Sequence, residues 1–339
     1  MTTLKDVAAA AGVSVKTVSN VVNGYAGVSP RMRARVEKVV AELDYHPNLS
    51  ARSLRTGRTG IVALAVPELS EPYFAEVAQC VVSAARARDW TVLVDQTEGE
   101  PAREKWVIGA SRRHLLDGVI MSPLGLDDRA LSTRDESLPL VLLGERVSPS
   151  AGTDHVAIDN VAAAREATEH LLATGRRRIG VIGVQRDRRW ATSHLRLRGY
   201  RAALAAHRVR VDTRLFGEVA GFDRRAGRQA VHELLARDAR PDALFCFNDL
   251  LAYGAIRTLH EAGLRVPDDV AVVGFDDNTH DEDAVPSLTS VSPDKEQLAE
   301  FAVAALADRI AAADPPAPRE FTVPHALRVR ESSAPASRP

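Results

Sequence analysis

The stretch that decides the fold of the N-terminal part is residues 3–24, TLKDVAAAAGVSVKTVSNVVNG. Thr3 can cap a first helix, with Asp6 three residues later as a variant of the capping box. Gly12 permits the positive φ that a turn between two helices needs, and Ser14 can cap a second helix. The stretch therefore predicts two short helices joined by a tight turn.

The second helix, residues 15–22, has an apolar side and a polar side when its residues are placed at about 100° intervals. Its apolar side would pack on Val7, Ala8 and Ala11 of the first helix, and it consists of Val18, Val21 and Val22. Ser29-Pro30 starts a third helix, and such short helices need one shared core. Small residues at the crossing, glycine at the turn and valines behind the second helix are typical of a helix-turn-helix, whose second helix enters a major groove.

The polar side of the second helix carries side chains suited to base recognition. Lys16 can donate to guanine O6 and N7, Asn20 can bind adenine N6 and N7, and Val15 can pack on a thymine methyl group. A further set is expected at phosphates, where contacts fix the register: Ser14, Thr17, Ser19, Asn23, Arg31 and Arg33. The alternative is a small helical bundle with a solvated polar face.

The charge of the chain is unevenly distributed. The 339 residues have a net charge of −1, but residues 1–60 hold nine Lys and Arg against four Asp and Glu, which gives +5 there and −6 elsewhere. A basic head on an acidic body indicates a polyanion partner for the head alone. Cys80 and Cys246 lie in apolar stretches and are predicted to be free thiols. Because we find neither a signal core nor about 18 continuous apolar residues, we expect a cytoplasmic protein with no membrane partner.

From residue 61 onward, apolar runs of strand length alternate with helix-length segments. The runs include IVALAVP (61–67), TVLVDQ (91–96), IGVIGV (179–184), ALFCFND (243–249) and VAVVGFDD (270–277). Continuous Val, Ile and Leu runs of this kind predict parallel strands covered by helices on both faces. The length indicates two α/β lobes with a break near Asp159-Asn160, and the tail from Glu331 is predicted to be disordered.

Polar and aromatic residues follow the predicted strands, where ligands bind in two-lobed α/β folds. Aromatic rings together with an arginine and an aspartate suit a sugar, and the candidates are Tyr73, Phe74, Arg196, Phe222, Asn248, Asp249 and Asp276. Phe74 and Phe222 fit the core equally well, and Arg196 could form a surface salt bridge. Asp276 ends a buried apolar run, so its carboxylate needs a polar role.

Enzyme motifs are not found in the sequence. It has neither a phosphate-binding glycine loop nor a nucleophile elbow, so we predict no catalytic residues, no cofactor and no metal. The acidic run HDEDA (280–284) is interpreted as a solvated loop rather than a metal site.

An ordered series of motifs resembles the lactose-repressor/galactose-repressor (LacI/GalR) family of bacterial transcription regulators. After residues 3–24, the series continues with VSPRMRARVEKVVAELDYHPNLSARSLRTG (28–57), EPYFAEV (71–77), PDALFCFND (241–249), VPDDVAVVGFDD (266–277) and LTSVSPDKEQL (288–298). The resemblance implies an all-α helix-turn-helix head and a hinge helix, followed by a periplasmic-binding-protein-like (type I) α/β core of two doubly wound lobes.

The resemblance also implies boundaries. We expect the DNA-binding domain at 1–47, the hinge at 48–58, the effector-binding and dimerisation core at 59–330 and the disordered tail at 331–339. Within the core, the N-terminal lobe would comprise about 59–160 plus 290–320, and the C-terminal lobe about 161–289 plus 321–330.

Individual positions match the family's functional residues. Val15, Lys16 and Asn20 match its base-reading positions, although Asn20 stands where an arginine is usual. Leu54 matches the leucine that wedges into the minor groove at the dyad, with Asn48 and Ala51 in the same hinge. Effector-binding positions of the family are matched by Arg196, Phe222 and Asp276, with Tyr73 and Phe74 near them.

The function implied is that of a ligand-responsive regulator without enzymatic activity. We expect a repressor of carbohydrate transport and catabolism genes that binds a palindromic operator as a homodimer, with a small-molecule effector, expected to be a sugar, between the lobes. The alternative is a solute-binding receptor of the same core fold with no DNA role, which would carry an export signal and no basic head.

Overall fold

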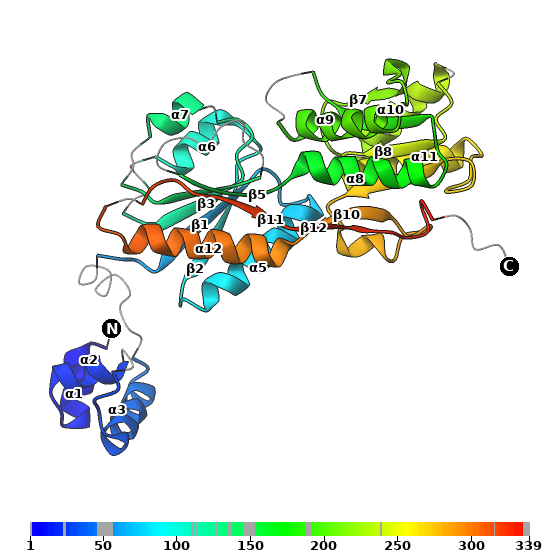
Figure 1. The fold of residues 1–339 in the computed structure, drawn as a ribbon. Coiled ribbons are helices and arrows are strands. Elements are labelled where there is room, and N and C mark those ends of the chain that lie inside the picture. Colours follow the sequence, from blue (N-terminus) through cyan, green and yellow to red (C-terminus); the bar gives the residue numbers. More distant parts are fainter. Residues whose placement is uncertain are drawn as a thin grey trace. The chain divides into compact units, whose positions relative to one another are not determined.

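The structure is a computed structural model that describes residues 2–22, 25–45, 57–109, 112, 114–126, 128–134, 137–144, 153–186, 191–237, 239–314 and 316–334. The chain divides into two compact units, a head of Met1–Gly60 and a core of Ile61–Pro339. Figure 1 shows the helical head and the mixed α/β core.

The head contains helices α1 (Leu4–Ala11), α2 (Val15–Val22) and α3 (Pro30–Glu42). Thr3 caps α1 and forms the predicted capping box with Asp6, and Gly12 ends the helix with a φ of 63°. The hydroxyl of Ser14 accepts a bond from the Thr17 amide at 3.1 Å, which caps α2. Ser29 caps α3. The predicted helix starts and the turn are confirmed.

The core of the head is small and built from all three helices. Its buried members are Val7, Ala8, Ala11, Val18, Val21, Val36 and Tyr45. Val22, predicted to face inward, is partly buried at the edge of this cluster. Burial of the valines on the inner side of α2 fixes which side of that helix remains exposed, because side chains at i, i+3 and i+4 share one face.

The N lobe of the core contains a parallel sheet of order β11-β5-β4-β3-β1-β2. Its strands are β1 (Ile61–Val66), β2 (Thr91–Gln96), β3 (Gly118–Met121), β4 (Leu140–Leu143), β5 (Asp154–Ile158) and β11 (Glu320–Val323). One face packs on α5 (Pro72–Arg86) and α12 (Lys295–Ala311), and the other on α6 (Pro101–Val107) and α7 (Asp128–Ser132). The edge strand β2 is an exception to full coverage, with Leu93 and Val94 40% and 41% exposed.

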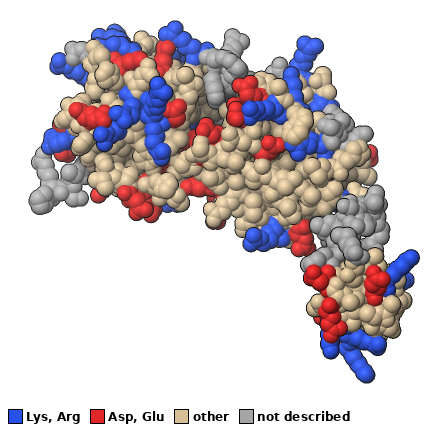
Figure 2. Space-filling model, turned by 180° about the vertical axis from the view of Figure 1, so that it is seen from behind, with Lys and Arg blue, Asp and Glu red and all other residues tan. Residues whose placement is uncertain are grey.

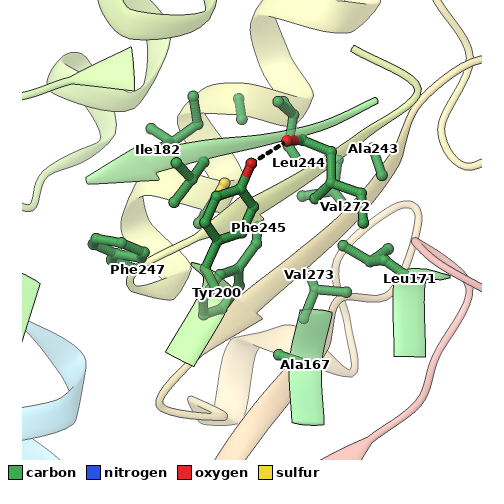
Figure 3. Close-up of a cluster of buried hydrophobic side chains, with 14 of the residues drawn as sticks. Ala167, Leu171, Ile182, Tyr200, Ala243, Leu244, Phe245, Phe247, Val272 and Val273 are labelled. Atoms are coloured by element: carbon green, nitrogen blue, oxygen red, sulfur yellow. Dashed lines mark hydrogen bonds between the residues drawn. The ribbon is translucent and has the colours of Figure 1, made fainter. Parts of the chain in front are cut away.

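The C lobe contains a sheet of order β12-β10-β9-β8-β6-β7, parallel except for β12. Its strands are β6 (Ile179–Val184), β7 (Phe216–Glu218), β8 (Ala243–Cys246), β9 (Ala271–Phe275), β10 (Thr289–Pro293) and β12 (His325–Arg328). Helices α8 (Asn160–Ala173) and α9 (Ala191–Ala206) pack together, as do α10 (Arg224–Ala236) and α11 (Asp249–Glu261). Figure 3 shows this core, where the Tyr200 hydroxyl donates to the Ile179 carbonyl at 2.8 Å.

The chain passes between the lobes at positions that differ partly from the expected ones. The first passage, at Asp159, lies where the predicted break was, because Asp159 caps α8 directly after β5. We expected the next passages at residues 290 and 321. Instead β10 pairs with β9 in the C lobe and β11 pairs with β5 in the N lobe, so the passages follow Pro293 and Val323. The strand β10 was not predicted because its sequence is polar, although its Thr289, Ser290 and Val291 are buried.

The tail prediction is wrong for residues 331–334. Ser332 and Ser333 are 0% and 2% exposed. The Ser332 carbonyl accepts from the Val272 amide at 2.8 Å, and its hydroxyl donates to the Val272 carbonyl at 2.7 Å. The serine-rich composition predicted disorder, but short hydroxyl side chains can also bond buried backbone groups of a strand, as Ser332 does on β9. Residues 335–339 lie outside the described residues.

None of the helices in the described ranges has the length and apolar character that crossing a membrane would need.

Candidate functional site

The exposed side of α2 carries the predicted base-reading residues. Val15 is 42% exposed, Lys16 is exposed and Asn20 is half-buried, whereas Val18 and Val21 are buried behind them. Figure 2 shows Lys and Arg side chains at the surface of the head. An apolar, a cationic and an amide side chain thus lie on one short helix, and these side-chain types suit contacts with base edges in a major groove.

The predicted phosphate-binding residues differ in their exposure and in their hydrogen bonds within the head. The Ser14 and Thr17 hydroxyls lie 2.8 Å apart and Ser14 also caps α2. Arg31 is exposed, Ser19 is half-buried, and Arg33 donates from Nη2 to the Tyr25 carbonyl at 2.8 Å. The remaining predicted DNA contacts lie outside the described residues: Asn23, Asn48, Ala51 and Leu54.

Tyr25 is a head residue that the sequence analysis did not single out. It follows α2, is 61% exposed, and its amide donates to the Asn20 carbonyl at 2.8 Å. Its ring lies over Gly27, where a Cβ atom would come within 2.5 Å of it. The sequence signal that could have identified Tyr25 is an aromatic residue in a glycine-rich turn. The hydrogen bond of its amide and the contact of its ring with Gly27 hold this exposed ring in one position.

A cleft of about 730 Å³ is lined by residues of both lobes of the core. This volume is within the range of ligand pockets, about 300–1,000 Å³. Six of the predicted effector residues lie in its lining: Tyr73, Phe74, Arg196, Phe222, Asn248 and Asp276. Strand ends of both sheets supply this lining, which is where open α/β folds bind ligands.

Arg196 is held rigidly in the cleft wall and forms no surface salt bridge. Its Nε donates to Asn160 at 2.8 Å, one terminal nitrogen donates to the Phe247 carbonyl, and the guanidinium stacks 3.4 Å from the Phe275 ring centroid. Its other terminal nitrogen lies 3.8 Å from Asp276, and both side chains are 7% exposed. The pair is therefore a preorganised charged group with its orientation set by the protein.

The backbone of Asp276 is strained. Its φ is 111°, a region that residues with a side chain rarely adopt. Such conformations persist only where surrounding structure enforces them, and they cluster at functional sites. Asp276 directly follows β9, and its carboxylate lies in the cleft wall beside Arg196.

The aromatic residues of the cleft serve the core as well. Tyr73 and Phe74 make an edge-to-face pair with centroids 5.2 Å apart and pack against the N-lobe core. Phe222 lies edge-on to Phe247 at 6.5 Å and packs against the C-lobe core. These rings are partly buried and also line the cleft. Each ring therefore packs on the core with one side and faces the cleft with the other, so the two interpretations do not exclude each other.

Asn248 connects the two lobes within the cleft. It caps α11 by accepting from the Leu251 amide at 2.9 Å, and its Nδ2 donates to the Phe222 carbonyl at 3.0 Å and to Glu71 at 2.9 Å. Glu71 precedes α5 in the N lobe and was missed by the sequence analysis, which interpreted its neighbours Tyr73 and Phe74 only. Burial raises the pKa of Glu71 to about 7, against the lowering effect of Asn248 and of the Arg196 charge.

Asp249 does not belong to the cleft lining, which corrects its predicted placement. It is fully buried and accepts from Ser290 at 2.6 Å and from the Asn278 amide and side chain at 3.2 and 3.1 Å. Burial and the neighbouring carboxylates Asp281 and Asp276 raise its pKa well above the usual range. Asn248 and Asp249 are adjacent at a helix start, and only the first side chain points into the cleft.

The acidic run 280–284 is not a fully solvated loop as predicted. Asp281 is completely buried and accepts from the Tyr253 hydroxyl at 2.5 Å. Burial raises the pKa of Asp281 to about 6. His280, Glu282 and Asp283 are exposed. A tyrosine on α11 supplies the hydrogen bond that lets one carboxyl of the run be buried, because buried polar groups need partners.

Comparison with known proteins decides the family. Residues 3–48 match the pattern of bacterial regulatory proteins of the lacI family, and residues 168–333 match a periplasmic binding protein-like domain. The chain is 37% identical to the HTH-type transcriptional regulator CelR of Thermobifida fusca, over 97% of this chain and 98% of that protein. It is 33% identical to DegA of Bacillus subtilis, over 98% of both. The chain belongs to the LacI family.

Solved structures of LacI-family members agree with this assignment. The complex of the regulator CelR with cellobiose is 34% identical, covers 98% of this chain and 100% of that one, and has a TM-score of 0.72. The lac repressor dimer bound to operator and the anti-inducer ONPF is 26% identical, covers 98% and 99%, and has a TM-score of 0.83. The predicted family is confirmed, as are the helix-turn-helix head and the two-lobed α/β core; residues 48–56 of the predicted hinge helix lie outside the described residues. The protein is a DNA-binding, helix-turn-helix transcription regulator with a periplasmic-binding-protein-like core.

Proposed function

We propose that this LacI-family member is a ligand-responsive repressor of carbohydrate transport and catabolism genes. It binds a palindromic operator as a homodimer and takes a neutral saccharide into the cleft between its lobes. The observation that carries the proposal is the presence, in one chain, of the exposed polar side of α2 and of a cleft lined by the buried, preorganised pair Arg196 and Asp276.

We assign base recognition to Val15, Lys16 and Asn20. The exposure of Val15 and Lys16 supports this assignment. We assign phosphate contacts to the set expected from the sequence: Ser14, Thr17, Ser19, Asn23, Arg31 and Arg33. A single head reaches few base pairs, each worth about 1–3 kcal/mol of discrimination. Two heads related by a two-fold axis double that sum, which is the physical reason for a palindromic operator.

We assign the domain-level roles as the sequence analysis expected. Residues 1–47 bind the operator, and 48–58 form the hinge with Asn48, Ala51 and Leu54 at the minor groove. The core from residue 59, which the buried Ser332 and Ser333 extend to 334, binds effector and dimerises. A paired leucine wedge costs a few kcal/mol in unstacked bases, so two hinges must act together.

Dimerisation of the core is supported by the edge strand β2. An edge strand with exposed apolar side chains is a site of association unless it is covered, and Leu93 and Val94 of β2 are exposed in the single chain. The lac repressor, a relative of the same fold, forms a dimer on its operator. A second copy of this chain is the partner we propose for this edge.

The saccharide is proposed from the chemistry of the cleft. Aromatic rings can stack on the apolar face of a pyranose, while Asp276, Asn248 and the Arg196 guanidinium can bond its hydroxyls. Arg196 is already balanced by Asp276, so the buried lining residues that the structure describes offer no second cation for an anionic ligand. The related regulator CelR binds cellobiose, which makes a neutral disaccharide the first compound to test.

The experiment is selection of operator sequences from random duplexes with the full-length protein, followed by titration of the selected operator with and without cellobiose. We expect an enriched inverted repeat, and a change in operator affinity of about 5- to 150-fold on adding the effector, corresponding to a coupling of about 1–3 kcal/mol. Enrichment of no symmetric sequence would refute the operator model. Binding of cellobiose and a panel of other neutral disaccharides without any change in operator affinity would refute the regulatory coupling.

A further inference from the structure

The segment Asp276–Thr279 directly follows β9 and carries the cleft carboxylate of Asp276. Asp276 and Asp277 both have positive φ values, 111° and 49°. Residues with side chains hold such values only where the surrounding structure enforces them. The contacts of this segment therefore determine whether Asp276 keeps its place beside Arg196.

The C lobe holds the first three backbone amides of the segment. The amides of residues 276, 277 and 278 donate, in that order, to the Val291 carbonyl at 2.8 Å, the Ser290 hydroxyl at 3.1 Å and the Asp249 carboxylate at 3.2 Å. Ser290 in turn donates to Asp249 at 2.6 Å. Asp249 is not a lining residue of the cleft, but it supports the segment that carries one.

The N lobe holds the fourth residue of the segment. Thr279 donates from its amide at 2.9 Å and from its hydroxyl at 3.0 Å to one carboxylate oxygen of Glu76 on α5. The other oxygen of Glu76 accepts from Lys295 Nζ at 2.5 Å, and the same ammonium group donates to the Asp277 carbonyl at 2.9 Å. Lys295 begins α12, which packs against α5 in the N lobe (Figure 1). We call Glu76 and Lys295 the interlobe clamp.

The interlobe clamp is sensitive to the position of the lobes. Three of its hydrogen bonds cross from the N lobe to the C lobe. Bonds with an ionised partner are stronger than neutral ones, and the side chains of Glu76 and Lys295 are only 19% and 12% exposed, so water screens the pair little. Since hydrogen bonds form only over a narrow range of distances, these three bonds require nearly the lobe arrangement of this structure. Lys295 also lies 6.0 Å from the ring centroid of the cleft residue Tyr73.

We propose that Glu76 and Lys295 are positioning residues for effector recognition. From the N lobe they hold residues 277–279, so that Asp276 of the C lobe is placed for the saccharide only in the lobe arrangement of this structure. A ligand shifts an equilibrium by its differential affinity for the two states. A saccharide bound through Asp276 therefore favours the clamped arrangement. The inference deepens the proposed function, on which it rests for the cleft as the effector site.

The first test is a double-mutant cycle on the full-length protein, read by calorimetric titration with cellobiose. Glu76→Ala should lower the affinity about 10-fold in the native chain, because residues of one hydrogen-bond network are coupled by roughly this amount. In an Asp276→Asn background the same change should cost less than about twofold, because the clamp acts through Asp276. Equal losses in the two backgrounds, or no loss in the native chain, overturn the proposal.

Two further variants secure this cycle. Lys295→Met keeps the length of the side chain but loses its hydrogen bonds to Glu76 and Asp277. It should reproduce the cycle, and it replaces Glu76→Ala if that variant does not fold. Glu300→Gln is the matched control, because Glu300 is an exposed carboxylate on α12, and its cellobiose affinity should equal that of the native chain.

The second test needs no ligand, and so separates this inference from the choice of saccharide. Hydrogen exchange of the full-length protein is measured at single amides by mass spectrometry with fragmentation. The amides of Asp276 and Asp277 donate to C-lobe acceptors and not to Glu76. If the clamp positions them, they should exchange about 10-fold faster in Glu76→Ala than in the native chain, and at the native rate in Glu300→Gln. Unchanged exchange at both amides in Glu76→Ala refutes the positioning role. Faster exchange in a protein that binds no saccharide supports the clamp and refutes the proposed effector instead.

Discussion

Replacement of Asp276 by asparagine removes the charge that we assign to effector binding while keeping the shape of the side chain. Asp276 is 5% exposed, lies 3.8 Å from the Arg196 guanidinium and is held at a φ of 111°. Asparagine tolerates positive φ better than most residues, so Asp276→Asn perturbs the backbone little. It also keeps an oxygen that can face Arg196.

The size of the effect follows from hydrogen-bond energies. A bond to a charged group contributes about 1.5–3 kcal/mol and one between neutral groups about 0.5–1.5 kcal/mol. For two saccharide hydroxyls on the carboxylate, the loss is about 2.5 kcal/mol, which is a decrease in effector affinity on the order of 50-fold. Because Arg196 keeps its bonds to Asn160 and Phe247, the folding free energy should fall by less than the roughly 3–5 kcal/mol typical of a fully orphaned buried charge.

The assay is calorimetric titration of cellobiose, with operator affinity measured by mobility shift in its absence and presence. Asp276→Asn should lose the effector response and keep operator binding without effector, since the head is a separate compact unit. Asp283→Asn makes the same chemical change at an exposed position and should leave both properties unchanged. A folded Asp276→Asn protein with effector affinity within twofold of the native value would refute the assignment.

Three further predictions concern the head and the folding of the core. Lys16→Ala should reduce the discrimination between bases at one operator position by about 1–3 kcal/mol, whereas Arg31→Ala should weaken binding to all duplexes equally. If each variant lost the same affinity for the selected and the scrambled duplex, the assignment of Lys16 to the base-reading side of α2 would be wrong. Gly12→Ala should destabilise the head by about 1–2 kcal/mol, because alanine is strained at a φ of 63°, and an unchanged melting temperature would contradict this. Burial alone would raise the pKa of Asp154, but hydrogen bonds from Arg309 and a second arginine keep it below its usual value. Stability from that group should therefore be lost as the pH falls below about 4. Urea unfolding of Arg309→Gln at pH 7 should show a loss smaller than the roughly 3–5 kcal/mol of a fully orphaned buried charge, because Arg319 still donates to Asp154.

Features governed by short-range rules could be predicted from the sequence. The capping box of Thr3 and Asp6, the turn at Gly12 and the cap at Ser29 each depend on atoms within a few residues of one another. The break at Asp159 follows the same logic, because the side chain of this aspartate caps the next helix by accepting from the amides of Val161 and Ala162.

Features that depend on distant partners could not be predicted. The sequence around Glu71 indicates only the start of a helix, whereas Asn248, which donates a hydrogen bond to Glu71, lies in the other lobe. The burial of Asp249 depends on Ser290 and Asn278, and that of Asp281 on Tyr253. No local pattern distinguishes a carboxyl with such partners from a solvated one, so adjacent polar residues at a strand end could not be sorted into cleft and interior.

The central claim is that the exposed side of α2 recognises a specific duplex under control of the cleft. The most direct test is the affinity of the full-length protein for its selected inverted repeat and for a scrambled duplex, each measured with and without a bound saccharide. The account predicts that the saccharide changes the affinity for the inverted repeat by about 5- to 150-fold. In the tighter-binding state, the protein should bind the inverted repeat much more tightly than the scrambled duplex. Equal affinities for the two duplexes, or an affinity for the repeat that does not respond to the bound saccharide, would contradict it.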